Sequence, residues 1–202
     1  MKPAGIVLAG GLSRRMQGPE KSLLILNGAT LISRVAERLR EQVADIAINA
    51  NGDAERFQEA ECPVISDTVP GHVGPLAGVL TGMRWAAERR LTHIATVAAD
   101  TPFFPYDLVP RLRSKAATET SIVMASSGGR VHPVCALWPV SLADALEDFL
   151  VVEDKRKILE FAERYDLHEE QFLNDNLDPF FNINTPDDLA EAKRHLEAET
   201  VG

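Results

Sequence analysis

The stretch GPLAGVLTGMRWAAERRLTHIATVAAD, residues 74–100, decides the fold class of this chain. In its first part, apolar residues recur at helical spacing and predict a helix over residues 74–90. These apolar residues are Leu76, Val79, Leu80, Met83 and Ala87. The second part, residues 93–100, is a short and mostly apolar run that predicts a buried strand. A helix that leads directly into a buried strand is typical of an α/β fold with a largely parallel sheet.

The same alternation extends in both directions from this stretch. Upstream, the predicted elements are strands at 4–10, 46–51 and 63–67 and an amphipathic helix at 31–43. Downstream, residues 121–126 and 133–139 are predicted to pair like a hairpin, which would make the sheet mixed. We therefore expect an α/β three-layer sandwich: a Rossmann-like, mostly parallel but mixed sheet with helices on both faces.

The C-terminal stretch FFNINTPDDLAEAKRHLEAE, residues 180–199, predicts a strand followed by a helix. Thr185 is suited to the N-cap of this helix, and Pro186 to its first position. Asp187 and Asp188 would lie in the first turn, where the helix dipole favours negative charge.

The composition is that of an ordinary globular chain. Its 202 residues are 45% hydrophobic and 25% charged, and no Pro-, Gly- or Ser-rich linker divides them, so we expect a single domain over residues 1–202. The formal net charge of −9 disfavours non-specific attraction to nucleic acid or to anionic membranes, and we expect neither as a partner. An anionic ligand would therefore have to bind at a local basic site.

Nothing in the sequence directs the chain to a membrane or to secretion. The apolar run near residue 4 is too short for a signal peptide, and no segment approaches the roughly 20 apolar residues of a membrane span. Cys62 and Cys135 belong to no C-x-x-C motif, so we expect reduced thiols that fill space. These features favour a cytoplasmic location.

Polar residues follow several of the predicted strands. In open α/β sheets, ligands bind beyond the carboxyl ends of the strands, so these positions are the first candidates for a site. The residues are Gly10 and Gly11 after the first strand, Asn49 and Asn51 at the second, Asp67 at the third and Asp100 at the fourth. Two amides, two carboxylates and a glycine-rich loop could therefore share one edge of the sheet.

The loop after the first strand is the first cationic cluster of an acidic chain. Residues 10–22 carry Arg14, Arg15 and Lys21 against only Glu20. Adjacent glycines let the backbone approach a ligand, and exposed N–H groups with three cations offer many donors to phosphate oxygens. The loop matches neither the Walker A pattern nor G-x-G-x-x-G. A phosphate-binding loop is the functional interpretation, and a solvated surface loop is the alternative.

Asp100 is the second candidate. A carboxylate at the exit of a buried apolar strand is costly unless it meets water, a cation or hydrogen-bond donors. Mg²⁺ would suit it, because Mg²⁺ is commonly held by one or two carboxylates with water and substrate phosphates completing its shell. The alternative is an aspartate that caps the turn before a helix, and both roles can coexist.

Six motifs occur in the order and spacing of the molybdenum cofactor guanylyltransferases, which the chain resembles nearly end to end. They are LAGGLSRRMQGPEKSLLILNG (8–28), INAN (48–51), ISDTVPGHVGPLAGVLTGM (65–83), AADTPFFP (98–105), RVHPVCALWP (130–139) and NINTPDDL (182–189). The resemblance implies transfer of GMP from GTP to the phosphate of molybdenum-molybdopterin, with Mg²⁺ as cofactor. It implies these two small molecules as partners and leaves room for transient contact with molybdoenzymes or their chaperones.

The resemblance also implies roles for single residues. Four would lie against the nucleotide through the backbone: Leu8, Ala9, Gly10 and Gly11. Two would contact the nucleoside: Asn49 and Asp67. Three would be catalytic, with Lys21 on phosphate and Asp100 on Mg²⁺: Arg15, Lys21 and Asp100. Four match positions on the pterin side: Arg15, Gly18, Asn182 and Asn184.

One position departs from the family pattern. Family members usually have glycine after Arg-Met, whereas this chain has Gln17 before Gly18. If that glycine needs a positive φ, the path of the loop must shift or Gln17 must tolerate strain.

Two other functions stay open. The same fold could transfer CMP to molybdopterin, or act as another small-molecule nucleotidyltransferase. From a different class, the chain could be a GTP-binding module for molybdoenzyme maturation without turnover. The presence of both Lys21 and Asp100 argues against such a non-catalytic module.

Overall fold

A computed structural model describes residues 1–10, 20–70, 74–174 and 177–201 of the chain. The main strands are β1 (Ala4–Leu8), β4 (Asp45–Asn49), β5 (Val64–Ile65), β6 (His93–Ala98), β7 (Ile122–Ser127), β8 (Arg130–Pro139) and β9 (Leu167–Phe172). A separate small hairpin contains β2 (Ile25–Leu26) and β3 (Ala29–Thr30). The helices are α1 (Leu31–Arg40), α2 (Pro75–Glu88), α3 (Leu108–Lys115), α4 (Ala143–Val151), α5 (Ile158–Ala162) and α6 (Pro186–Val201), with short 3₁₀ turns η2 (Lys21–Leu23), η3 (Glu55–Ala60) and η4 (Val140–Leu142).

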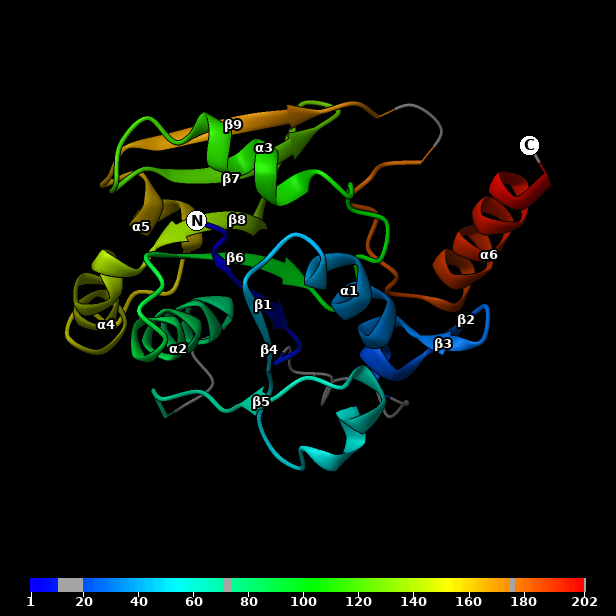
Figure 1. The fold of residues 1–202 in the computed structure, drawn as a ribbon, viewed down its shortest axis with the longest axis horizontal. Helices are drawn as coiled ribbons and strands as arrows, with labels where there is room; N and C mark the ends of the chain where they lie inside the picture. Colours follow the sequence, from blue (N-terminus) through cyan, green and yellow to red (C-terminus); the bar gives the residue numbers. More distant parts are fainter. Residues whose placement is uncertain (11–19, 71–73, 175–176, 202) are drawn as a thin grey trace.

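The main strands form one seven-stranded sheet in the order β5-β4-β1-β6-β8-β7-β9, which runs from β5 at the bottom of Figure 1 to β9 at the top. β5, β4, β1 and β6 are parallel, and β9 is parallel to β7. β8 lies between β6 and β7 and is antiparallel to both. The prediction of a mostly parallel but mixed sheet is therefore confirmed.

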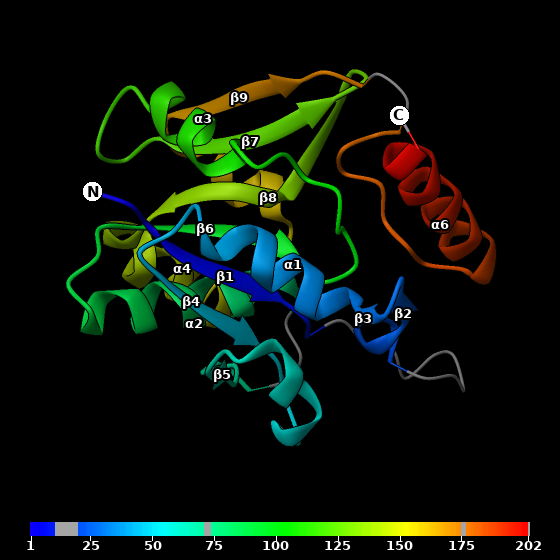
Figure 2. The same cartoon turned by 45° about the vertical axis from the view of Figure 1, so that its right-hand side comes forward.

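Helices cover both faces of the sheet (Figure 1 and Figure 2). On one face, α1 and α3 contribute Val35, Leu39 and Leu112 to a core that includes Val7 of β1. On the other face, α2, α4 and α5 bury apolar residues against the opposite side of β1 and β6. Side chains of a strand alternate between its two faces, so a central strand with helices on both sides is apolar throughout. This arrangement is the three-layer sandwich that the alternation predicts.

The segment before α6 departs from the prediction. Residues 180–184, all within the described ranges, form no strand, so the predicted strand is wrong there. One backbone hydrogen bond, from Ile183 N–H to the Asp100 carbonyl at 2.9 Å, ties the segment to the end of β6. Ile183 is instead buried in a small third core that joins α6 to the β2–β3 hairpin. A run of about five residues is too short for its hydrophobic pattern to distinguish a strand from an irregular segment whose side chains are buried against other elements.

The start of α6 follows the prediction closely. The Thr185 hydroxyl accepts a hydrogen bond from the Asp188 N–H at 3.1 Å, as an N-cap does. The Asp188 carboxylate in turn accepts from the N–H groups of Asn184 and Thr185, both at 2.8 Å. These backbone hydrogen bonds lower the pKa of Asp188. The reciprocal cap fixes the residues just before the helix, which include Asn184.

The two cysteines are unpaired in the structure. Cys135 of β8 is buried, and this burial raises the pKa of its thiol to about 12, which makes it unreactive. Among the helices of the described residues, none combines the length and the apolarity needed to cross a bilayer.

Candidate active site

The carboxyl ends of β5, β4, β1 and β6 lie at one edge of the sheet, since the four strands are parallel. The chain passes from β1 to β4 on one side and later returns to pair β6 on the other side, so the strand order reverses beside β1. Ligands of open α/β sheets bind at such a reversal point. Sheet hydrogen bonds continue to the Leu8 carbonyl and the Ala9 N–H, and Gly10 beyond them is exposed. The backbone at residues 8–10 therefore opens onto the expected ligand position.

Asp67, Asn49 and Asn51 form one polar cluster at the ends of β4 and β5. Asn49 Nδ2 donates to Asp67 Oδ1 at 2.9 Å, and Asn51 Nδ2 donates to Asp67 Oδ2 at 2.7 Å. The Asn51 side-chain oxygen also accepts from the Asp67 N–H at 3.0 Å. Each carboxylate oxygen thus has one amide donor and keeps lone-pair capacity for a ligand. The structure brings together Asn49 and Asp67, the two residues for which the family resemblance implies contact with the nucleoside.

Gly78 of α2 makes room for this cluster. A Cβ atom at residue 78 would lie 2.2 Å from Asn49 Oδ1 and 2.7 Å from Leu8 Cδ2, distances that no packing tolerates. One turn later, a Cβ at Gly82 would lie 2.6 Å from Cγ1 of Ile6. Residues four apart lie on the same helical face, so the two glycines let α2 pack closely on β1. Only the first of them borders a candidate site residue.

A second polar cluster surrounds the end of β6. Lys21, at the start of η2, donates through Nζ to Asn184 Oδ1 at 3.0 Å. Asn182, two residues earlier, accepts at Oδ1 from the Thr101 hydroxyl at 2.6 Å. Because Ile183 between them binds the Asp100 carbonyl, the segment 182–184 crosses the exit of β6 and reaches Lys21. Four residues predicted for the site, Lys21, Asp100, Asn182 and Asn184, are thus brought together from distant parts of the chain.

The Asp100 carboxyl is half-buried where β6 ends. Burial raises its pKa above the usual value, while its own backbone N–H, the Lys21 ammonium and the Thr101 hydroxyl act in the opposite direction. The Thr101 hydroxyl lies 3.5 Å from Asp100 Oδ1, which is too far for a strong hydrogen bond, and it donates its short hydrogen bond to Asn182 instead. The carboxylate therefore retains oxygen lone pairs for a cation or for donors on a ligand.

Three predicted site residues, Gly11, Arg15 and Gly18, lie outside the described residues, as does Gln17. Asn51 is a strand-end candidate in the sequence but received no role there, and the structure shows that it holds Asp67. Two others that contact the site were not identified from the sequence: Thr101 and Gly78. Thr101 directly follows the strand-end carboxylate Asp100, which is the signal that could have identified it. Gly78 lies within GPLAG, but a helical glycine reveals its packing partner only in three dimensions.

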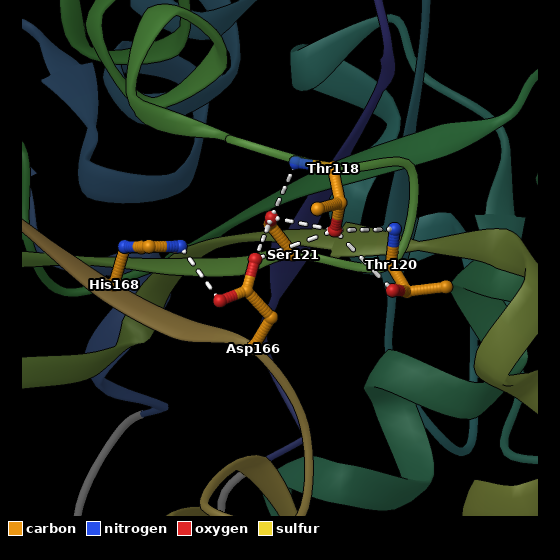
Figure 3. A network of polar contacts seen from close by, with 5 residues as sticks. All are labelled: Thr118, Thr120, Ser121, Asp166 and His168. Carbon is orange, nitrogen blue, oxygen red and sulfur yellow. Dashed lines mark hydrogen bonds and ion pairs between the residues drawn. The ribbon is translucent and has the colours of Figure 1, made fainter.

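Another polar network lies at the opposite edge of the sheet. Figure 3 shows Thr118, Thr120, Ser121, Asp166 and His168 joined by hydrogen bonds and an ion pair. Ser121 and Asp166 directly precede β7 and β9. Because β8 is antiparallel to both β6 and β7, and β9 is parallel to β7, both β7 and β9 run in the same direction as β6. The network therefore lies at the edge where the strands begin, opposite to the candidate site. Hydrogen bonds from Ser121 and His168 lower the pKa of Asp166. The network joins the starts of two strands and has no part in the candidate site.

Comparison with known proteins gives a consistent result. The family model of the MobA-like NTP transferase domain matches residues 5–169. The molybdenum cofactor guanylyltransferase of Mesorhizobium japonicum is 50% identical over 202 residues, covering 98% of this chain and 97% of the relative. That of a Bradyrhizobium species is 46% identical over 193 residues, covering 94% and 91%.

A solved structure agrees with these sequence relatives. Molybdopterin-guanine dinucleotide biosynthesis protein A from Archaeoglobus fulgidus superposes with a TM-score of 0.73 at 28% identity, covering 96% of this chain and 99% of that one. The sequence relatives and the solved structure therefore agree on the family and on the fold, over nearly the whole chain. The chain is a nucleotidyltransferase that belongs to the MobA-like NTP transferase family, among the molybdenum cofactor guanylyltransferases.

Proposed function

We propose that this protein transfers GMP from GTP to the terminal phosphate of molybdenum-molybdopterin, forming the guanine dinucleotide cofactor and pyrophosphate. One observation supports this most directly: a lysine, a carboxylate and two asparagines meet where β6 ends, beside a second cluster suited to a nucleoside. β5 and β6 are separated by two strands, so the clusters are about 14 Å apart at the usual strand spacing. An extended nucleoside triphosphate can occupy both.

The reaction needs no protein nucleophile. A phosphate oxygen of the acceptor attacks the α-phosphorus of GTP, the bond to the bridging oxygen of the β-phosphate breaks, and pyrophosphate leaves with the electron pair. The acceptor is a phosphate monoester, mostly dianionic near pH 7, so it needs no strong base. The main barrier is the approach of two anions, and positioned cations lower it. Lys21, oriented by Asn184, would supply one such cation, and Arg15 another.

Asp100 fits the requirements of a magnesium ligand. Its carboxylate is half-buried, lacks a short hydrogen bond from Thr101 and lies within electrostatic range of Lys21. Among the described residues there is no group of three or more His, Cys, Asp or Glu side chains that could hold a metal. One carboxylate, with water and phosphate oxygens, is however an ordinary ligand set for Mg²⁺. When bound, the ion would stabilise negative charge on the departing pyrophosphate.

The other assigned residues complete the proposed site. Backbone atoms of residues 8–11 would line the nucleotide, and Asn49 and Asp67 would contact the nucleoside. Asn182, Asn184, Arg15 and Gly18 would face the pterin. We propose a single catalytic domain over residues 1–202, because the described main strands form one sheet with a core on each face, and α6 packs with the β2–β3 hairpin and the start of α1 in the third core. The unpaired thiols suit a reducing compartment, and we place the reaction in the cytoplasm.

The test is the nucleotide preference of the purified protein. kcat/KM for pyrophosphate release is measured with GTP, CTP and ATP, with molybdenum-molybdopterin as acceptor and equal Mg²⁺. Acceptors such as the Asp67 carboxylate can pair with the N1–H and amino group of guanine, and cytosine would leave some of them unpaired. Each unpaired buried acceptor costs about 1–3 kcal/mol, so GTP should be preferred over CTP by about 10² or more.

Two outcomes would contradict the proposal. Equal or better use of CTP would make the protein a cytidylyltransferase of the same fold. Binding of GTP without pyrophosphate release in the presence of acceptor would make it a non-catalytic maturation module.

A further inference from the structure

Arg56, in η3, contacts Asn51 of the first polar cluster and Glu20, the residue before Lys21 of the second cluster, and the proposed reaction gives it no role. Its Nη2 donates to the Asn51 carbonyl at 2.7 Å, and its Nε forms a 3.0 Å ion pair with Glu20 Oε2. Both side chains of the ion pair are largely covered, with exposed fractions of 28% for Arg56 and 24% for Glu20. The guanidinium also lies over the buried ring of Phe57, 4.6 Å from its centroid.

On one side, Arg56 supports the cluster around Asp67. The Asn51 side chain is hydrogen-bonded to both the backbone N–H and the carboxylate of Asp67. Any shift of Asn51 therefore moves the Asp67 carboxylate as well. Gly52 follows with φ of +90°, and a Cβ there would lie 3.2 Å from Arg56 Nη1. The tight turn therefore brings the Asn51 carbonyl within reach of the guanidinium.

On the other side, Arg56 holds the residue next to Lys21. Glu20 accepts a hydrogen bond from the Ser22 hydroxyl at 3.3 Å, and its carbonyl accepts from the Leu23 N–H at 2.9 Å to begin η2. A carboxylate at residue 20 opposes the binding of a polyphosphate at Lys21 unless a cation neutralises it. Arg56 supplies that cation from another part of the chain.

We propose that Arg56 is a positioning residue for the nucleotide: it neutralises Glu20 beside Lys21 and fixes Asn51, and through Asn51 the Asp67 carboxylate. This inference rests on the proposed function, since it assigns phosphate to Lys21 and the nucleoside to Asp67. A planar guanidinium can bind two acceptors along two edges, whereas a lysine ammonium has one point of charge. Arginine at this position is therefore required for both contacts at once.

The test compares Arg56→Ala, Arg56→Lys and the double variant Glu20→Gln/Arg56→Ala. Arg56→Ala should raise KM for GTP, and Kd for GTP measured by calorimetry without acceptor, about tenfold, with kcat within about threefold. Arg56→Lys should be intermediate, because it retains the charge and loses the contact to Asn51. The double variant should recover part of the affinity, because the uncompensated carboxylate is gone. KM for the acceptor should not change.

Arg164 provides a matched control. It pairs with Glu153 through two 2.7 Å contacts and lies 4.6 Å from the Phe149 ring centroid, so like Arg56 it combines a carboxylate partner with an aromatic ring, away from the site. Arg164→Ala should lower Tm about as much as Arg56→Ala and leave the affinity for GTP unchanged.

The outcomes separate this inference from the proposed function. A wild-type protein that neither binds GTP nor releases pyrophosphate overturns both. If the wild type uses GTP and Arg56→Ala binds it with wild-type affinity, or if the double variant recovers nothing, this inference alone is wrong. Should Arg56→Ala fail to fold, Arg56→Gln and Glu20→Gln/Arg56→Gln provide the same comparison, because glutamine also removes the charge and keeps more of the side chain.

Discussion

The position of Asp100 lowers the stability of the fold and at the same time suits its carboxylate to binding a ligand. Its carboxyl is half-buried at the end of an apolar strand, and burial raises its pKa. A group in this state destabilises the folded protein when ionised, and it persists where a ligand compensates for the burial. This reasoning gives Asp100→Asn two opposite effects.

For Asp100→Asn we expect Tm to stay equal or rise slightly, because the amide has the same size and no charge to bury. We expect kcat/KM to fall by at least about 10², the scale seen when one principal electrostatic element is removed. The measurements are thermal unfolding and pyrophosphate release over a range of Mg²⁺ concentrations. A folded variant with near-normal turnover would exclude Asp100 as the metal ligand.

Lys21 is expected to act on the substrate and hardly on the fold. It is half-buried, and its side chain makes one hydrogen bond to the residues that the structure describes, with Asn184. A cation about 4 Å from a phosphate contributes about 4 kcal/mol at an effective dielectric constant of 20, and an exposed loop contact contributes far less. Lys21→Ala should therefore lower kcat/KM for GTP by about 10² or more and change Tm by less than about 2 °C. Lys115→Ala, at the exposed end of α3, is the control and should change neither. A large loss of Tm with unchanged kcat/KM would make Lys21 structural.

At the scale of elements, the packing of α2 on β1 also shapes the site. Gly78 and Gly82 make similar close contacts, the first with the polar Asn49 and the second with the apolar Ile6. The two positions therefore separate the effect of packing from the effect on the site.

Gly78→Ala should displace the Asn49 side chain and break its 2.9 Å bond to Asp67, because Asn49 is buried and has no free space. We expect Kd for GTP to rise about tenfold, the cost of about one charge-assisted hydrogen bond. Gly82→Ala should instead overpack the core, cost about 1–3 kcal/mol and leave Kd for GTP unchanged. Titration calorimetry and thermal unfolding of both variants measure these effects. Equal affinity for GTP in both variants would mean that Gly78 serves packing alone.

The ion-pair cluster between α4 and β9 predicts a dependence of stability on pH. Hydrogen bonds from Arg164 and Lys155 lower the pKa of Glu153 from 4.5 to about 2. Because the folded-state pKa is depressed, this cluster stabilises the protein above the unfolded-state value and loses that effect as the pH falls from about 5 to 2. The Tm difference between wild type and Glu153→Gln should be constant above pH 5 and vanish near pH 2.

The size of this difference should be small and should shrink with added salt, since the groups are exposed. Glu163→Gln is the control, because Glu163 is exposed and forms no ion pair within the part of the chain that the structure describes. A difference for Glu153→Gln that persisted at pH 2 would show that its effect is not electrostatic.

At the scale of the whole molecule, the two clusters of the site belong to different parts of the chain. Asp67 and Asn49 belong to the first half, whereas Asn182 and Asn184 come from the segment that leads into α6. A nucleotide bound across the edge of the sheet would join β5, β6 and this segment, and should stabilise them together.

GTP with Mg²⁺ at about 100 times Kd should therefore raise the unfolding free energy by about 2.7 kcal/mol. For a chain of this size, that corresponds to a Tm increase of about 5–11 °C. Thermal scans across a GTP titration measure it, with CTP as comparison. The shift should disappear in Lys21→Ala at the same GTP concentration, and a shift retained in that variant would place GTP elsewhere.

Local sequence determined most of the elements and several site residues. The spacing of the apolar positions predicts α1, α2 and the four parallel strands. The helical and the strand period both follow from backbone geometry, so a short stretch of sequence is enough to recognise them. The cap of α6 is equally local, since Thr185 and Asp188 interact across one turn. The rule that polar residues at strand ends form a site identifies Asn49, Asp67 and Asp100 without any knowledge of the strand order.

Only the tertiary structure decided which distant segments meet. β8 follows β7 in the chain yet lies between β6 and β7, and no periodicity encodes such a neighbour relation. Lys21 and Asn184 are 163 positions apart, and the segment of residues 182–184 looks like a strand until its partners are known. The ion pair of Arg56 with Glu20 also joins distant segments, whereas its hydrogen bond to the Asn51 carbonyl spans only five positions. Secondary structure follows from interactions between near neighbours in the chain, whereas these contacts depend on how the whole core closes around the sheet.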